Sequence, residues 1–143
     1  MNWTEVQLAY LAGIIDGEGT FYIYVGKNGR KFNSRIYVVN TNEEIINWLK
    51  ATFGGLVYSR TSPKNPLWKR KFEWILDKKA QDIVCVKILP YLIIKKKHAE
   101  VMIEFRKSFT QQSYQHISEE TLAFRFACHK KIKTLNHETS ISV

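Results

Sequence analysis

The sequence has little cysteine, no long apolar run, and fewer acidic than basic residues. Its two cysteines, Cys85 and Cys128, form no CxxC motif and lie in apolar stretches with helical spacing, so we predict reduced core thiols. No apolar run approaches the roughly 20 residues that cross a bilayer, which excludes a membrane partner. The opening MNWTEVQLAY has neither a basic leader nor a small-residue cleavage site. We therefore expect an intracellular protein, in a prokaryotic cytoplasm or an organelle matrix, that is not secreted.

The excess of basic residues points to a polyanionic partner. Lys and Arg number 22 against 13 Asp and Glu, which gives a net charge of +9 on 143 residues. A merely soluble basic protein is the alternative on charge alone. The 7 Tyr and 4 Trp are mixed with the basic residues, and this mixture favours a nucleic-acid partner. The length and the absence of a linker or repeat predict one domain over residues 1–143.

Hydrophobic periodicity predicts alternating helices and hairpins. The expected elements are a helix at 5–15 with Thr4 as N-cap, a hairpin over 20–40, a helix capped by Thr41 or Asn42 and stopped at Gly54-Gly55, a second hairpin from LVYSR and WKRKFEWIL across TSPKNP, a helix from KKAQDIVCVKILPYL ending near Pro90, and helices at 97–107 and 118–135. This order is αββαββα followed by further helices. It predicts an α+β fold with an antiparallel sheet and helices on one face.

The stretch LAGIIDGEG at 11–19 is unusual for a helix because glycine recurs in it. Ala9, Gly13 and Gly17 are spaced four residues apart and leave one helix face without side chains, and Ala12 widens this strip. Another backbone can approach such a face closely. The partner is either the sheet of the same chain or the same helix of a second copy.

Glu18 follows this strip, where the glycines let the chain turn. If two such helices pack side by side, two Glu18 carboxylates meet at one edge and repel each other unless cations lie between them. Carboxylate oxygens suit Mg²⁺, which keeps water and binds phosphate oxygens. The pattern therefore points to metal-assisted phosphodiester hydrolysis.

LAGIIDGEG resembles the signature of the LAGLIDADG homing endonucleases, and the element order over about residues 5–107 is similar to that family's core. The resemblance implies a saddle-shaped sheet, with residues 110–143 as a C-terminal helical extension. Family members with one motif form homodimers, and this chain has one motif. The resemblance thus implies a C2 homodimer, with an interface that contains Ala9, Ala12, Gly13 and Asp16.

The same resemblance assigns roles around the motif. Glu18 is the metal-binding acid, where the family more often has Asp, and the Gly17 carbonyl is a second oxygen ligand. Mg²⁺ is the expected cofactor, with Mn²⁺ as a substitute. Asp16 is expected to hold the helix end and the interface through hydrogen bonds.

Two further catalytic residues follow from the resemblance. LPYLIIKKKHAE matches the family segment that brings a lysine to the active site, which places Lys95 there and Lys97 nearby. The alternative is a solvated lysine run at a helix start. Asn40 fits the amide that orders water near the metal, and Asn42 is the second choice.

Strand alternation predicts a polar sheet face opposite an apolar one. Such a face suits the major groove, because Arg and Asn read base edges and Lys contacts phosphates. Glu73 shares the parity of this face. The expected DNA-binding residues are Tyr22, Tyr24, Asn28, Arg30, Asn33, Arg35, Tyr37, Tyr58, Arg60, Lys69, Lys71 and Lys97.

The resemblance implies an intron-encoded, site-specific endonuclease that cuts both strands of a long pseudo-palindromic DNA target and leaves 3′ overhangs. One alternative is a catalytically silent nucleic-acid binder, such as a maturase that binds its intron RNA. A second is a LAGLIDADG-like transcriptional regulator. Such regulators usually carry an added helix-turn-helix domain, and the segment after Phe109 is too short to resemble one.

Overall fold

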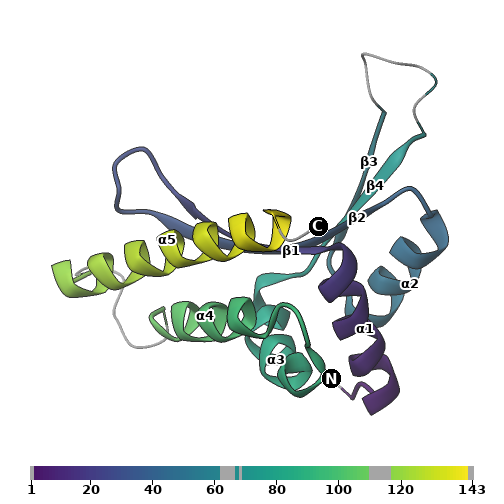
Figure 1. The fold of residues 1–143 in the computed structure, drawn as a ribbon, viewed down its shortest axis with the longest axis horizontal. Coiled ribbons are helices and arrows are strands. Elements are labelled where there is room, and N and C mark those ends of the chain that lie inside the picture. The colour runs from purple at the N-terminus through teal and green to yellow at the C-terminus, as the bar shows by residue number, and fades with distance from the viewer. Residues whose placement is uncertain (1, 62–66, 68, 110–116, 142–143) are drawn as a thin grey trace.

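A four-stranded antiparallel sheet with helices on one face organises the chain (Figure 1). The computed structural model describes residues 2–61, 67, 69–109 and 117–141. In chain order the elements are α1 (Glu5–Glu18), β1 (Gly19–Val25), β2 (Phe32–Asn40), α2 (Glu43–Phe53), β3 (Leu56–Arg60), β4 (Lys71–Ile75), α3 (Lys78–Ile88), a 3-10 turn (Leu89–Tyr91), α4 (Lys96–Lys107) and α5 (Glu119–Ile141). The predicted α+β class is confirmed.

The strand order β1-β2-β4-β3 joins the two hairpins through β2 and β4. Figure 1 shows the hairpins rising toward opposite sides of the molecule above α1 to α4, which gives the sheet its saddle shape. β4 begins at Lys71, later than the predicted start at residue 68. Residue 68 and most of the predicted turn TSPKNP lie outside the described residues.

Helix α1 begins at a capping box and runs three residues beyond its predicted end. The Thr4 hydroxyl accepts a hydrogen bond from Gln7 N at 3.1 Å, and the Gln7 side chain accepts one from Thr4 N at 3.0 Å. The helix continues through Glu18 and stops at Gly19, whose backbone is extended. A Cβ at Gly19 would lie 2.7 Å from the Ile15 Cα, so glycine is required for this tight exit into β1.

The core lies between the sheet and the helices below it. Its sheet side is formed by Phe21 and Ile23 of β1, Ile36 and Val38 of β2, and Trp74 of β4, all at most 1% exposed. These alternate residues confirm the predicted apolar face. Full burial of one such side chain contributes about 1.5–3 kcal/mol.

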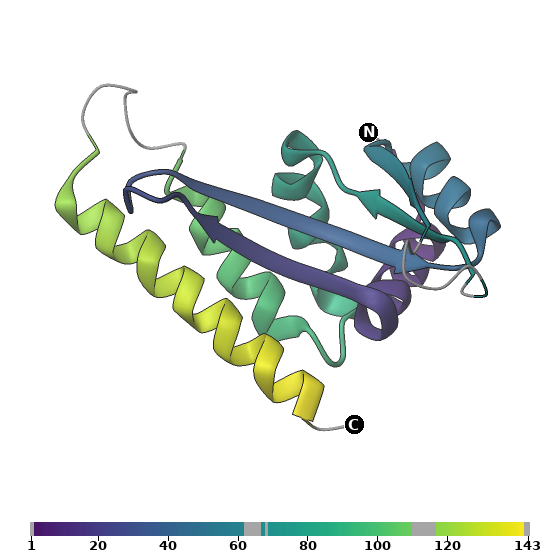
Figure 2. The same ribbon diagram turned by 90° about the horizontal axis from the view of Figure 1, so that it is seen from above.

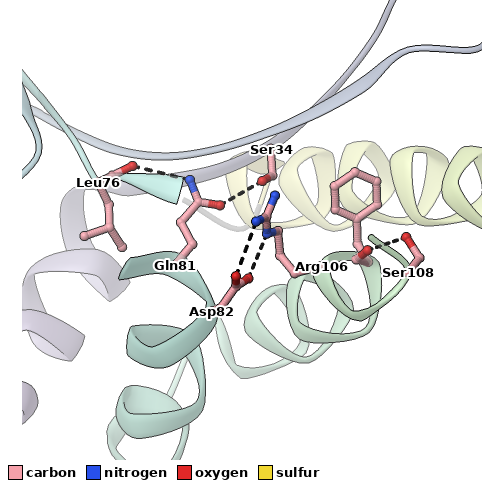
Figure 3. A network of polar contacts seen from close by, with 7 residues as sticks. Ser34, Leu76, Gln81, Asp82, Arg106 and Ser108 are labelled. Carbon is pink, nitrogen blue, oxygen red and sulfur yellow. Dashed lines mark hydrogen bonds and ion pairs between the residues drawn. The ribbon is translucent and has the colours of Figure 1, made fainter. Parts of the chain in front are cut away.

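Polar contacts tie the underside of the sheet to α3 and α4 (Figure 3). The Ser34 hydroxyl donates to Gln81 Oε1 at 2.8 Å, and the Gln81 amide donates to the Leu76 carbonyl at 3.3 Å. Arg106 Nε donates to Asp82 Oδ1 at 2.8 Å, which joins α4 to α3. Each buried polar group in this network is therefore partnered rather than left unsatisfied.

Helix α5 covers the free edge of β1, as Figure 2 shows from above. His129 Nδ1 lies 2.6 Å from the Ile23 carbonyl oxygen, and the Asn136 amide donates to the Phe21 carbonyl at 2.9 Å. These contacts satisfy edge groups that would otherwise be open to another strand. They also anchor the polar residues after Leu135, where the helix was predicted to end, so α5 continues to Ile141.

Cys85 and Cys128 are both buried and unbridged, which confirms the prediction of reduced thiols. Burial, reinforced by the nearby Asp82 carboxylate, raises the pKa of Cys85 to about 12. A thiol with this pKa is inert at neutral pH. Among the helices of the described residues, none has the length and apolarity that crossing a membrane requires.

Candidate functional site

Glu18 stands at the carboxyl end of α1, where the helix dipole already concentrates negative charge. Its side chain is exposed and forms no hydrogen bond or ion pair with any residue that the structure describes. A carboxylate in this place lowers stability slightly unless a cation is near. Among the described residues, the helix end thus gains no hydrogen bond or ion pair from this carboxylate.

Lys95 reaches the same helix end from the segment before α4. Its ammonium donates to the Ile15 carbonyl at 3.0 Å and also to the Gly19 carbonyl. Burial lowers the pKa of Lys95, and the carboxylates of Asp16 and Glu18 oppose this shift. The structure thus brings Glu18 and Lys95 to one helix end, 77 residues apart in the sequence, with a half-buried cation in place.

Asp16 acts within its own chain. Its carboxylate accepts three backbone N–H groups, from Ile93 at 2.8 Å, Ile94 at 3.1 Å and Lys95 at 2.9 Å. Asp16 was predicted to form hydrogen bonds that hold the helix end and the interface. The bonds in the structure join the end of α1 to the segment that leads into α4. These bonds fix the backbone of Lys95, so Asp16 positions the lysine rather than meeting a ligand itself.

Asn40 lies at the end of β2, near α1 in the register, since Val38 is opposite Gly19. Its Oδ1 accepts a hydrogen bond from Asn42 N at 2.8 Å, and Asn42 Oδ1 in turn caps α2 through Ile45 N. The Asn40 Oδ1 is thus engaged in a turn and Asn42 is the helix cap. Among the residues that the structure describes, no hydrogen bond links Asn40 to Glu18 or Lys95, so its catalytic role stays a prediction.

The donor set at the end of α1 consists of hard oxygens, which fit Mg²⁺ or Ca²⁺. Glu18 offers a free carboxylate next to backbone carbonyls such as that of Gly17. No group of three or more Asp, Glu, His or Cys side chains among the described residues is placed to hold a metal. A divalent ion at Glu18 would therefore need further ligands besides this carboxylate, such as backbone carbonyls, water or a phosphate oxygen.

The outer face of α1 is open. Ala9, Gly13 and Gly17 are exposed, and a Cβ added at either glycine would meet nothing within 4 Å. Ala12 is 0% exposed, so its predicted place in a dimer interface is wrong. Successive helical residues point about 100° apart, and this turns Ala12 into the core of its own chain.

Exposed apolar side chains flank this strip. Val6 is 78% and Tyr10 52% exposed, and both line a cavity with Trp48 of α2. Ile93 and Ile94 are 88% and 58% exposed beside Asp16. Sequence reasoning missed these two isoleucines, although their apolar character directly before a lysine run was a usable signal.

The register places the predicted polar residues of the strands on one sheet face. Tyr22 is opposite Arg35, and Arg60 is opposite Lys71. The Arg35 guanidinium lies over the Tyr24 ring, 5.2 Å from its centroid. Asn33 and Tyr37 share this face on β2, and Tyr58 shares it on β3.

Other predicted contact residues lie off the strands. Asn28 and Arg30 belong to the turn between β1 and β2, where Asn28 Oδ1 accepts from Arg30 N at 3.0 Å. Lys69 is exposed before β4, and Lys97 is exposed in the first turn of α4 rather than on the sheet.

Glu73 departs from the basic character of this face. It is opposite Tyr58 in the register, yet only 5% exposed. Arg60 Nη2 donates to its Oε2 at 3.0 Å. Alternation placed Glu73 on the face, but no sequence signal indicated its burial or its arginine partner.

No family model matches the sequence, and no curated protein matches it. Solved structures do. The homing endonuclease I-CvuI in complex with its target shares 19% identity and a TM-score of 0.69, over 92% of this chain and 82% of its own. The archaeal intron-encoded homing endonuclease I-Vdi141I, complexed with DNA, shares 17% identity and a TM-score of 0.73, over 96% and 94%.

The LAGLIDADG meganuclease I-AabMI, bound to uncleaved DNA, shares 18% identity and a TM-score of 0.66 over 85% of this chain. The match spans 43% of that longer protein. At these identities the likeness establishes the fold. The chain has the fold of the LAGLIDADG homing endonucleases, as the motif at residues 11–19 predicts.

Proposed function

We propose, from this fold, that the chain is a site-specific DNA endonuclease that acts as a homodimer and hydrolyses phosphodiester bonds with a divalent metal, Mg²⁺ in the cell. The pairing of Glu18 with Lys95 at the carboxyl end of α1 carries the proposal. A free carboxylate and a held ammonium at one helix end suit a cation and a phosphate together. The similar structures are those of homing endonucleases or meganucleases bound to DNA, which agrees with this assignment.

Self-association follows from the open face of α1. Gly13 and Gly17 leave a strip on which a second α1 can pack closely, and the exposed side chains of Val6 and Tyr10 beside it gain by burial. A two-fold axis along this strip brings two Glu18 carboxylates together. The pair then supplies further ligands besides one Glu18 carboxylate.

Each residue has a separate task in this site. Glu18 and the Gly17 carbonyl hold the divalent ion, which supplies Lewis acidity toward the scissile phosphate. Lys95 lies beside them and stabilises the negative charge that develops on the phosphoryl oxygens. Asp16 fixes the backbone of Lys95, so the ammonium is in place before substrate binds.

The concave face of the sheet is the proposed DNA surface. Arg35, Arg60 and Lys71 lie on it with the tyrosines, and the net charge of +9 favours a polyanion. Two copies related by a two-fold axis fit a pseudo-palindromic target. The catalytically silent intron-RNA binder stays the second candidate, because a basic sheet face serves either nucleic acid.

Selection from a library of randomised palindromic DNA tests the proposal. The wild-type protein with Mg²⁺ is expected to cut a small set of sequences and leave 3′ overhangs, and Lys95→Met to bind the same set with strongly reduced cutting. Lys87→Met, at an exposed lysine of α3 below the sheet, is the matched control and keeps its cutting. Binding of structured RNA without DNA cutting, in Mg²⁺ or Mn²⁺, would replace the endonuclease with the RNA binder.

A further inference from the structure

Glu73 is an anomaly on the proposed DNA surface. It lies on β4 with Tyr58 opposite it on β3 and Val39 opposite it on β2, so its side chain is on the sheet face that turns away from the core. A carboxylate there repels phosphates, and burial to 5% exposure adds a desolvation cost. A carboxylate in this place is therefore costly unless a cation is paired with it.

Its partner is Arg60, one residue pair further along the hairpin. Arg60 Nη2 lies 3.0 Å from Glu73 Oε2. The side chain of Arg60 is 68% exposed, whereas that of Glu73 is 7% exposed. The Glu73 carboxylate is therefore buried, and the exposed Arg60 guanidinium is bound to it through a single nitrogen.

This geometry leaves an edge of the guanidinium available. Arg carries five N–H donors in a planar fork, and no other hydrogen bond of Arg60 occurs among the described residues. The salt bridge restricts the side-chain rotamers before any ligand arrives. An arginine that is held in this way loses less conformational freedom on binding than a free one.

We propose that Arg60 reads a guanine in the major groove, and that Glu73 is its positioning residue. The inference rests on the proposed DNA-binding function. Guanine presents two acceptors, O6 and N7, which match the arginine fork. A phosphate is a poorer match, because the anionic Glu73 would stand close to it, whereas a base edge is neutral.

Lys71 provides the contrast on the same face. It is the cross-strand neighbour of Arg60, exposed, and forms no ion pair among the described residues. A free lysine of this kind suits phosphate contacts, which hold DNA without reading its sequence. Arg60 thus contributes sequence specificity, and Lys71 contributes affinity for DNA of any sequence.

Two-fold symmetry sharpens the inference. In a homodimer each half-site meets its own copy of Arg60. The guanine preference must therefore occur twice, at positions related by the dyad of the target.

The test is a base-preference profile of DNA binding, measured without added metal on a library in which every target position is varied. Arg60→Ala and Arg60→Lys are both expected to reduce the guanine preference at one pair of symmetric positions by roughly 5- to 100-fold. Glu73→Ala is expected to weaken the same preference. Glu73→Gln, whose amide oxygen still accepts from Arg60, is expected to retain most of it, and Lys71→Ala to weaken binding equally for all sequences.

Each contrary outcome has its own meaning. A guanine preference that survives Arg60→Ala overturns the reading role. A preference that falls in Arg60→Ala but survives in Glu73→Ala overturns the positioning role. A wild-type protein that binds no DNA overturns the proposed function itself, and a profile in which Arg60→Ala lowers affinity uniformly makes Arg60 a phosphate contact and overturns this inference alone.

Discussion

Asp16 and Glu18 are two residues apart, yet the structure predicts opposite consequences for their loss. Asp16 accepts three backbone N–H groups at 2.8, 3.1 and 2.9 Å. Glu18 is exposed at the negative end of α1. Removal of Asp16 should therefore destabilise the fold, and removal of the Glu18 charge should not.

The size of the Asp16 effect follows from its bonds. A net contribution of about 1 kcal/mol for each hydrogen bond gives about 3 kcal/mol for Asp16→Ala. Asp16→Asn keeps one acceptor oxygen and loses the bond to Ile93 N, so we expect about 1–2 kcal/mol. For a chain of 143 residues, 3 kcal/mol corresponds to a fall in Tm of roughly 6–12 °C.

The assay is equilibrium unfolding in urea, followed by tryptophan fluorescence at one fixed protein concentration. Glu18→Gln is the matched control and should have a free energy of unfolding equal to or slightly above that of the wild type. An Asp16→Ala loss below about 0.5 kcal/mol, or a large loss in Glu18→Gln, would refute the division of roles.

Three further predictions concern packing, association and pH. Gly55→Ala should destabilise the fold by about 2 kcal/mol or more, since its φ is 92° and a Cβ would clash with the Ile75 carbonyl oxygen. Thermal unfolding checks this against the neighbouring Gly54→Ala, which should lose less stability, because its φ of 75° is also positive but its Cβ would meet nothing within 4 Å. Gly13→Leu should leave the circular dichroism spectrum unchanged and abolish self-association in sedimentation, and a stable dimer of this variant would exclude the α1 strip as the interface. Burial, reinforced by the Lys95 cation, lowers the pKa of His98 below 6.5 against the smaller opposing effects of Leu135, Asn136 and Glu138. The unfolded chain then binds the proton more readily, so the free energy of unfolding falls progressively as the pH drops below 6.5. The free energy of unfolding of His98→Gln, measured in urea, should fall less over the same pH range.

Much of the fold was predictable because local patterns fixed it. The alternation in residues 20–40 gave both the first hairpin and the apolar side of the sheet, and Asn42 was correctly among the two candidate caps of α2. The end of α1 was placed too early, because Gly17 weakens a helix in isolation. Tertiary contacts outweigh that cost here.

The site was predictable only in part, because its geometry depends on contacts distant in the sequence. The resemblance placed Lys95 near Glu18, but nothing local to either residue shows that Asp16 binds the backbone of residues 93–95. Ala12 was misplaced because spacing alone does not say which side of a helical strip is covered. Glu73 followed the strand parity, and its burial depends on the packing of three strands, which parity does not describe.

Cleavage of a selected target by Glu18→Gln, compared with the wild type at equal DNA occupancy and over a range of Mg²⁺ concentrations, decides whether the end of α1 is the catalytic site. We predict that Glu18→Gln folds and binds DNA as the wild type does and cuts at no Mg²⁺ concentration, and that Glu18→Asp partly recovers cutting because it restores a carboxylate. Cutting by Glu18→Gln at the wild-type rate would mean that the end of α1 is not the site of catalysis.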